Sequence, residues 1–151
     1  ICLAKAGLDR SNLLDRIEYE RLDPTTIVPA PAQGAIAVTA LDGDLATRLN
    51  DVLDHPHTRV ETTVERAILA DLGGGCVAPV GIHARLPGEY VNTTVRVLAQ
   101  DGSEEVRASR DLPVGRHVEA AREFGGELAE QGASDLIDRA RRDEPDDAKR
   151  A

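Results

Sequence analysis

The spacing of apolar residues changes from a helical period to a strand period near residue 80. Before this point, apolar residues recur at steps of three and four, which places them on one face of a helix. They are Val60, Val64, Ala67, Ile68 and Leu72. Asp54 or Thr58 is expected to cap the start of this helix, and Gly73 to end it, because glycine readily adopts the left-handed backbone that closes a helix.

After residue 80, apolar and polar residues alternate, which predicts strands. On the middle strand, alternate residues from Val91 to Ala99 share one face, and Asp101-Gly102 predicts a hairpin to the next strand. Helical spacing follows in two stretches, and together these elements predict an α+β domain whose three-stranded antiparallel sheet is covered by helices. The predicted strands are 80–86, 90–100 and 104–112, and the predicted helices are 116–131 and 134–141.

The first 53 residues give a weaker pattern. Residues 1–19 are typical of a strand end or loop that enters a short helix, and the proline-rich stretch RLDPTTIVPAPAQG (21–34) predicts an extended linker or edge strand. The apolar run 35–41 predicts a strand, and Asp44 is expected to cap a helix over 45–53. This lone strand has no evident partner in the sequence.

The composition argues against two classes of protein, those that bind nucleic acid and those that span a membrane. Only 2% of the 151 residues are aromatic and the formal net charge is −9, which argues against a nucleic-acid-binding surface. No apolar run reaches the roughly 18 residues of a membrane span and no signal peptide is visible, so we expect a cytoplasmic protein with no membrane partner. The chain begins with Ile1 and contains no methionine, which predicts that it is part of a longer protein.

Cys76 follows three glycines in DLGGGCVAPVG (71–81) and is the first candidate for chemistry. It could be a small buried residue at the start of a strand, since Gly73 alone suffices to end the helix. However, Gly74 and Gly75 add conformational freedom that a helix end does not require. A position after a helix C-terminus with no His or Lys nearby disfavours the thiolate, so Cys76 suits a permanent attachment better than a turnover nucleophile.

Other candidates have less support from the residues alone. His55, His57 and His83 do not show the spacing of a metal site, so no metal is expected. The glycines do not form a phosphate loop, because such loops precede a helix. Gln33 and Gly34 could face a ligand or belong to a plain linker, and Arg10 could bind a carboxylate or be solvated.

Three stretches together resemble the second half of the porphobilinogen deaminase (hydroxymethylbilane synthase) family. They are LAKAGLDR (3–10), PAPAQGAIAV (29–38) and HPHTRVETTVERAILADLGGGCVAPVGIHA (55–84), in the family's order and spacing. The family often has Gln after the loop cysteine and Gly before the crossover Gln, where this chain has Val77 and Ala32.

The resemblance implies a transferase of porphyrin (heme) biosynthesis that joins four porphobilinogen molecules head to tail, with release of ammonia, into hydroxymethylbilane. It implies a dipyrromethane cofactor held by a thioether to Cys76, with Arg10, Gln33 and Gly34 as cofactor-binding residues. The catalytic aspartate of the family belongs to a part that these residues do not match, so no catalytic residue is expected here and the chain alone is expected to be inactive.

The resemblance also implies a division of the chain. Residues 1–33 would end domain 2 and residues 34–53 would return into domain 1, both incomplete α/β domains, and 54–151 would form the cofactor-bearing α+β domain of an enzyme that is monomeric at full length. Two alternatives stay open from the residues alone. One is a non-enzymatic α+β binding or regulatory module with a buried Cys76, and the other is a cysteine hydrolase, for which a nearby His is missing.

Overall fold

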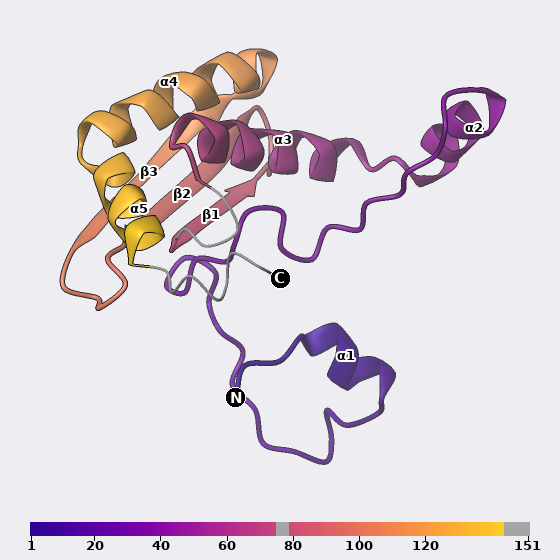
Figure 1. Ribbon diagram of the computed structural model, residues 1–151. Helices are drawn as coiled ribbons and strands as arrows, with labels where there is room; N and C mark the ends of the chain where they lie inside the picture. The colour runs from indigo at the N-terminus through magenta and orange to yellow at the C-terminus, as the bar shows by residue number, and fades with distance from the viewer. Residues whose placement is uncertain (75–78, 144–151) are drawn as a thin grey trace.

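A computed structural model describes residues 1–74 and 79–143 of the chain. Its second part is an antiparallel sheet of order β1-β2-β3 with helices against one face (Figure 1). This arrangement confirms the predicted α+β class. The helices are α1 (Lys5–Arg10), α2 (Asp44–Leu53), α3 (Pro56–Asp71), α4 (His117–Glu130) and α5 (Ala133–Arg142), and the strands are β1 (Val80–Arg85), β2 (Tyr90–Leu98) and β3 (Glu105–Pro113).

The core lies between the sheet and helices α3, α4 and α5. Alternate residues of β2 face it, as the strand period predicts, and Thr93 is buried among them with its hydroxyl donating to the carbonyl of Val91 at 3.2 Å. The hairpin between β2 and β3 turns at Gly102, with φ of 74°, and is confirmed. The largest fully buried apolar side chains are Ile68, Ile82, Leu112, Leu128, Ile137, Val64, Val91, Val95 and Val97.

Helix α4 lies close to α3 at one glycine. A Cβ built on Gly125 would stand 3.0 Å from the Cβ of Asp71 and 3.4 Å from the Cα of Ile68. The two helices therefore approach closely because Gly125 has no side chain, and this contact supports the end of α3 that leads to residue 74.

The start of α3 differs from the prediction. His55 is the N-cap, and its Nδ1 accepts the Thr58 N–H at 3.2 Å, while Asp54 pairs with Arg59 at 2.5 Å instead. Pro56 occupies the first helical position, where its fixed φ is favourable, and this makes the preceding His55 the capping residue. The prediction of Asp54 or Thr58 as the cap is wrong.

Helix α2 also begins differently from the prediction. Gly43 is its N-cap and no side chain caps it. Asp44 is the first helical residue instead, where its negative charge still favours the positive end of the helix dipole.

The first 53 residues form two extended arms, with α1 in one and α2 at the end of the other (Figure 1). The predicted strand over 35–41 is absent, because no neighbouring strand within the described residues supplies hydrogen bonds to it. Its apolar side chains remain exposed, with Ile36 at 86% and Leu41 at 92%. Within the described ranges, every helix is too short or too polar to cross a lipid bilayer.

Candidate functional site

The site begins where α3 ends. Gly73 has φ of 68°, and its N–H donates to the carbonyl of Ala70 at 3.1 Å. The N–H of Gly74 donates to the carbonyl of Leu69 at 2.9 Å. This pair of bonds is the Schellman arrangement, which satisfies the last carbonyls of a helix. The prediction that Gly73 ends the helix is therefore confirmed.

Gly74 has a packing role that the sequence alone does not reveal. A Cβ at this position would stand 2.3 Å from Cδ1 of Leu69, so any side chain would displace Leu69. The absence of a side chain at Gly74 thus serves the helix end itself. Cys76, the predicted attachment residue, lies outside the described residues, and neither its burial nor the hydrolase alternative is tested.

Helix α5 contacts the same end of α3. The Ser134 hydroxyl donates to the carbonyl of Leu72 at 3.4 Å, and the guanidinium of Arg141 donates to the carbonyl of Gly73. Positive charge and donors at a helix C-terminus stabilise its unpaired carbonyls. The carbonyl of Pro79 accepts the Leu98 N–H at 3.0 Å, so the chain is bonded to the domain on both sides of residues 75–78.

A second part of the site is the crossover segment, residues 21–34, which passes along the free edge of β1. The N–H of Ile82 on β1 donates to the carbonyl of Pro29 at 2.9 Å. Gly81 allows this approach, because a Cβ there would stand 2.4 Å from the carbonyl oxygen of Val28. The predicted alternatives are an extended linker and an edge strand. The segment is a linker that contains turns, and none of residues 21–34 forms a strand.

The crossover segment ends in two consecutive turns that carry Gln33 and Gly34. The backbone N–H of Gln33 donates to the carbonyl of Ala30 at 3.0 Å, and that of Ala35 donates to the carbonyl of Ala32 at 3.1 Å. Both candidate residues are exposed, and Gly34 has φ of 84°, which explains the glycine. Ala32 also has positive φ, 59°, so its departure from the family's glycine falls where glycine fits the backbone best.

Two acidic residues of α3 complete the edge of β1. Glu65 accepts the N–H of Ala84 at 2.8 Å and that of Ala32 at 2.6 Å, and Glu61 accepts the N–H of Leu86 at 2.9 Å. Burial raises the pKa of Glu65, although its two backbone hydrogen bonds act in the opposite direction. The outward N–H groups of the strand thus find acceptors and are unavailable for pairing with another strand.

Sequence reasoning missed Glu61 and Glu65. The available signal is two carboxylates four residues apart beside the apolar stripe of a helix, an arrangement whose mutual repulsion disfavours an isolated helix. Such a pair is retained where other groups bond to it, and here those groups are backbone N–H donors of β1 and of the crossover segment.

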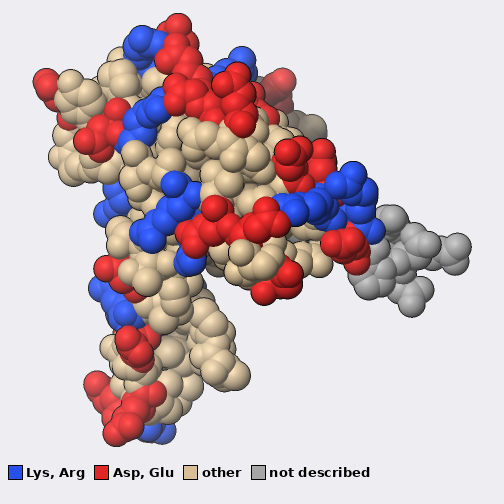
Figure 2. Space-filling model, turned by 90° about the vertical axis from the view of Figure 1, so that its left-hand side faces the viewer, with Lys and Arg blue, Asp and Glu red and all other residues tan. Residues whose placement is uncertain are grey.

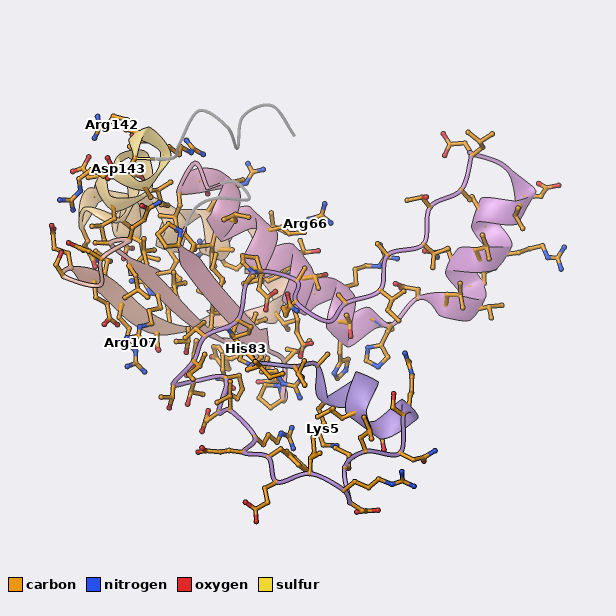
Figure 3. The ribbon with its side chains drawn as sticks, turned by 60° about the horizontal axis from the view of Figure 1, so that its bottom comes forward. Lys5, Arg66, His83, Arg107, Arg142 and Asp143 are labelled. Carbon is orange, nitrogen blue, oxygen red and sulfur yellow. The ribbon has the colours of Figure 1, made fainter. Side chains whose placement is uncertain are left out.

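His83 lies on the face of β1 that points toward the crossover segment (Figure 3). It is half-buried in this strand. Burial lowers its pKa, with the charge of Arg85 acting in the same direction and those of Glu61 and Asp23 opposing it. On the same face, Arg96 and Arg107 donate to the carbonyls of Thr26 and Thr25 at 3.1 and 3.0 Å.

Arg10 is not brought to this edge. It is the last residue of α1 and exposed, and its side chain forms no hydrogen bond or ion pair among residues 1–74 and 79–143. No hydrogen bond in that same part joins residues 1–22 to the rest of the chain. The structure thus brings Gln33 and Gly34 to the β1 edge, while Arg10 stays on a separate arm.

The electrostatic surroundings are mixed. Figure 2 shows acidic and basic side chains interspersed over one face of the molecule, with Arg139–Glu104 (2.7 Å) and Arg116–Glu123 (2.6 Å) among the surface ion pairs. Over the described ranges, His, Cys, Asp and Glu side chains do not gather in a group of three that could hold a metal ion. Cys2 is a free, exposed thiol.

The residues present suit a carboxylate-bearing cofactor. The exposed guanidinium of Arg10 has no acidic partner in the described part of the chain and is available to a carboxylate. The exposed side-chain amide of Gln33 can donate or accept a hydrogen bond. A concavity with a volume of about 650 Å³ lies between the extended stretch 35–40 and helices α2 and α3. Its lining includes apolar residues of this stretch and of α2, together with Arg59 and Arg66 of α3.

Two family models match the chain. Residues 1–49 match the porphobilinogen deaminase dipyromethane cofactor binding domain, and residues 60–132 match the porphobilinogen deaminase C-terminal domain. The cofactor predicted from the sequence, dipyrromethane, is thus the one that the family model describes.

Curated relatives are similar in sequence to this chain over nearly its whole length. A probable porphobilinogen deaminase of Halobacterium salinarum is 46% identical over 142 residues, which are 93% of this chain and 36% of the relative. A probable porphobilinogen deaminase of Methanosarcina mazei is 39% identical, over 93% of this chain and 44% of the relative. A porphobilinogen deaminase of Mycobacterium leprae is 44% identical, over 95% of this chain and 48% of the relative. The chain spans less than half the length of these relatives. It belongs to the porphobilinogen deaminase family.

Proposed function

We propose that this chain is the cofactor-bearing part of a hydroxymethylbilane synthase, which joins four porphobilinogen molecules into a linear tetrapyrrole with release of ammonia. The observation that carries the proposal is the pair of family matches in chain order, with Cys76 inside the segment matched to the C-terminal domain. Membership in an enzyme family favours this function over a non-enzymatic binding or regulatory module. A cytoplasmic enzyme that is monomeric at full length remains part of the proposal.

In this proposal Cys76 holds the dipyrromethane by a thioether, and Arg10, Gln33 and Gly34 bind it. When bound, the cofactor supplies the pyrrole end to which the first substrate is joined. The chain's own contribution is positioning. The Schellman end of α3 and the hydrogen bonds from α5 hold the chain just before residues 75–78, and the Pro79 contact holds it just after them. Arg10 would pair with a carboxylate once its arm is held near the loop.

The proposed division of labour follows from the coverage of the relatives. The Halobacterium salinarum relative continues well beyond the matched 142 residues, so we expect the catalytic aspartate and further arginines to come from its unmatched part. A chimera in which this chain replaces the matched portion of that relative should therefore form hydroxymethylbilane, whereas the 151-residue chain alone should not.

The covalent attachment has a direct test. The chimera, purified after expression, should carry a mass increment of two pyrrole units on the peptide that contains Cys76. Cys76→Ser should lose both the increment and activity, and the matched variant Cys2→Ser should keep both, because Cys2 is an exposed thiol elsewhere in the chain. An active chimera with an unmodified Cys76 would contradict the proposal.

A further inference from the structure

Glu65 is a buried carboxylate whose two oxygens serve two different segments. The residue is 6% exposed. Oε1 accepts the N–H of Ala84 on β1 at 2.8 Å, and Oε2 accepts the N–H of Ala32 in the crossover segment at 2.6 Å. These segments are 52 residues apart in the sequence, and one side chain of α3 joins them.

The chemistry of this contact requires a carboxylate. Both partners are N–H donors, so both oxygens must accept, and an ionised carboxylate is the side chain of this length that offers two acceptors and no donor. An amide would turn one of its two atoms into a donor facing another donor. Leaving a charge buried is unfavourable unless hydrogen bonds compensate it, so the two N–H groups and the carboxylate depend on one another.

The backbone that Glu65 holds is strained. Ala32 has φ of 59°, a left-handed conformation that an alanine rarely adopts, and Gly34 follows with φ of 84°. Gln33 stands between them and is exposed. A non-glycine residue in this conformation persists where its surroundings fix it, and such residues concentrate at ligand sites. At Ala32 the fixing contact is the bond to Glu65.

We propose that Glu65 is a positioning residue that holds Ala32 in its left-handed conformation and thereby directs Gln33 and Gly34 toward the cofactor and substrate chain. The positioning of Ala32 by Glu65 rests on the geometry alone. The functional half, in which Gln33 and Gly34 face the cofactor and substrate chain, rests on the proposed function. The proposal makes α3 the common support of both parts of the site, because the same helix ends at Asp71, shortly before Cys76 in the sequence.

Glu61 gives a matched control. It lies one turn earlier on α3 and accepts the Leu86 N–H at 2.9 Å, so it bonds to the continuation of β1 as Glu65 does, but it has no hydrogen bond to the described crossover segment. Glu61→Gln removes the same charge from the same helix edge. Any effect that is specific to the Ala32 contact must therefore appear in Glu65→Gln and not in Glu61→Gln.

The first test is amide hydrogen exchange on the 151-residue chain, read residue by residue by NMR. Glu65→Gln should accelerate exchange of the Ala32 amide about tenfold or more relative to Val95 in the core, and Glu61→Gln should leave the Ala32 rate unchanged. Equal acceleration at Ala32 and Val95 would mean a purely structural role and would overturn the inference, as would an unchanged Ala32 rate in Glu65→Gln.

A measurement on the unaltered chain guards against a variant that does not fold. The amide proton shifts of Ala32 and Ala84 should titrate with one common midpoint, equal to that of the Glu65 carboxyl carbon, because both donate to this group. Glu61 is the other charged group that acts on Glu65, so the titration is repeated in Glu61→Gln, where Ala32 and Ala84 should still share one midpoint. Separate midpoints for the two amides would overturn the shared contact.

The functional half is tested in the chimera with the Halobacterium salinarum relative. Glu65→Gln should raise KM for porphobilinogen about tenfold and change kcat less than about twofold, because misplacing a binding contact weakens substrate and transition state alike. Glu61→Gln should leave both values near those of the parent chimera. An unchanged KM in Glu65→Gln would refute the functional half. A chimera without any activity would instead refute the proposed function, while the exchange and titration results still decide whether Glu65 positions Ala32.

Discussion

Two regions of this chain follow the same rules of apolar spacing, yet one closes a core and the other does not. Every buried apolar residue of the described chain lies between Val64 and Ala140. Among residues 1–74 and 79–143, thirteen of the fifteen exposed large hydrophobic residues lie in the first 53 positions. Local sequence suffices to form α2, but burial needs a second surface, which α3, α4, α5 and the sheet supply to one another and the arms lack.

The contacts between the two regions are of a different kind from those in the core. They include hydrogen bonds to backbone groups of the crossover segment. Glu65 accepts the N–H of Ala32, and the arginines of β2 and β3 donate to the carbonyls of Thr26 and Thr25. Hydrogen bonds of this type define a path for the crossover segment. The segment can therefore be positioned by a few side chains, and single substitutions should move it.

The largest contrast should come from deleting one leucine in each region. Leu128→Ala removes a fully buried side chain and should lower the free energy of unfolding by about 2–5 kcal/mol, since it leaves a cavity. Leu41→Ala removes one that is 92% exposed and should change it by less than about 0.5 kcal/mol. Urea denaturation followed by circular dichroism measures both. A comparable loss in Leu41→Ala would mean that the arm packs against the domain in solution.

A second contrast lies within α4, between two neighbouring glycines. Gly125→Ala places a Cβ 3.0 Å from Asp71 and should cost about 1–3 kcal/mol, because α4 must move away from α3. Gly126→Ala meets nothing within 4 Å and should instead stabilise the helix by about 0.5–1 kcal/mol. Thermal and urea unfolding of the pair test this. Equal effects of the two substitutions would show that the α3 and α4 contact is looser than described.

The sequence predicts the domain better than the arms, for a physical reason. The strands, the hairpin at Gly102 and the Gly73 helix end follow from local periodicity and backbone preference, and the structure contains each of them. The strand over 35–41 has the right composition but lacks a partner, and pairing is not encoded in a single strand. The capping role of His55 depends on Pro56 beside it, a local rule that outweighed the usual preference for Asp or Thr.

The candidate site divides in the same way. Gln33 and Gly34 stand out in the sequence because of the resemblance, and Gly34 also has the backbone conformation that explains the glycine. The four-residue spacing of Glu61 and Glu65 is a local signal that something bonds to this pair, but it does not identify the partners of Glu65, which are backbone groups 33 and 19 residues away. A carboxylate that bonds only to backbone groups leaves no complementary residue type in the sequence from which to infer it.

The pH dependence of stability should separate Glu65 from the surface acids. Because burial raises its pKa above the ordinary value of 4.5, the folded chain binds this proton more tightly than the unfolded chain. Stability should therefore fall as pH rises from 4.5 through the raised pKa, by at most about 1.4 kcal/mol per pH unit. Glu104, Glu105 and Glu127 have lowered pKa values from their arginine partners and contribute the opposite slope at lower pH.

The difference in unfolding free energy between the parent chain and Glu65→Gln isolates this contribution. The parent should lose stability relative to Glu65→Gln as pH rises through that window, and the difference should level off above it. Urea titrations at a series of pH values measure the difference. A difference that is constant with pH, or that grows in favour of the parent, would contradict a raised pKa for Glu65.

The smallest effect concerns Ala32 and asks to which region the crossover segment belongs. Ala32→Gly relieves a left-handed alanine, with φ of 59°, and should raise the free energy of unfolding by up to about 1 kcal/mol if the segment unfolds together with the domain. Ala30→Gly is the matched control, because residue 30 has no positive φ and should only lose stability through added freedom of the unfolded chain. A gain in Ala32→Gly would assign the crossover segment to the cooperative unit through its bond to Glu65. A loss equal to that of Ala30→Gly would contradict the strain at Ala32, since removing the side chain there would then bring no relief.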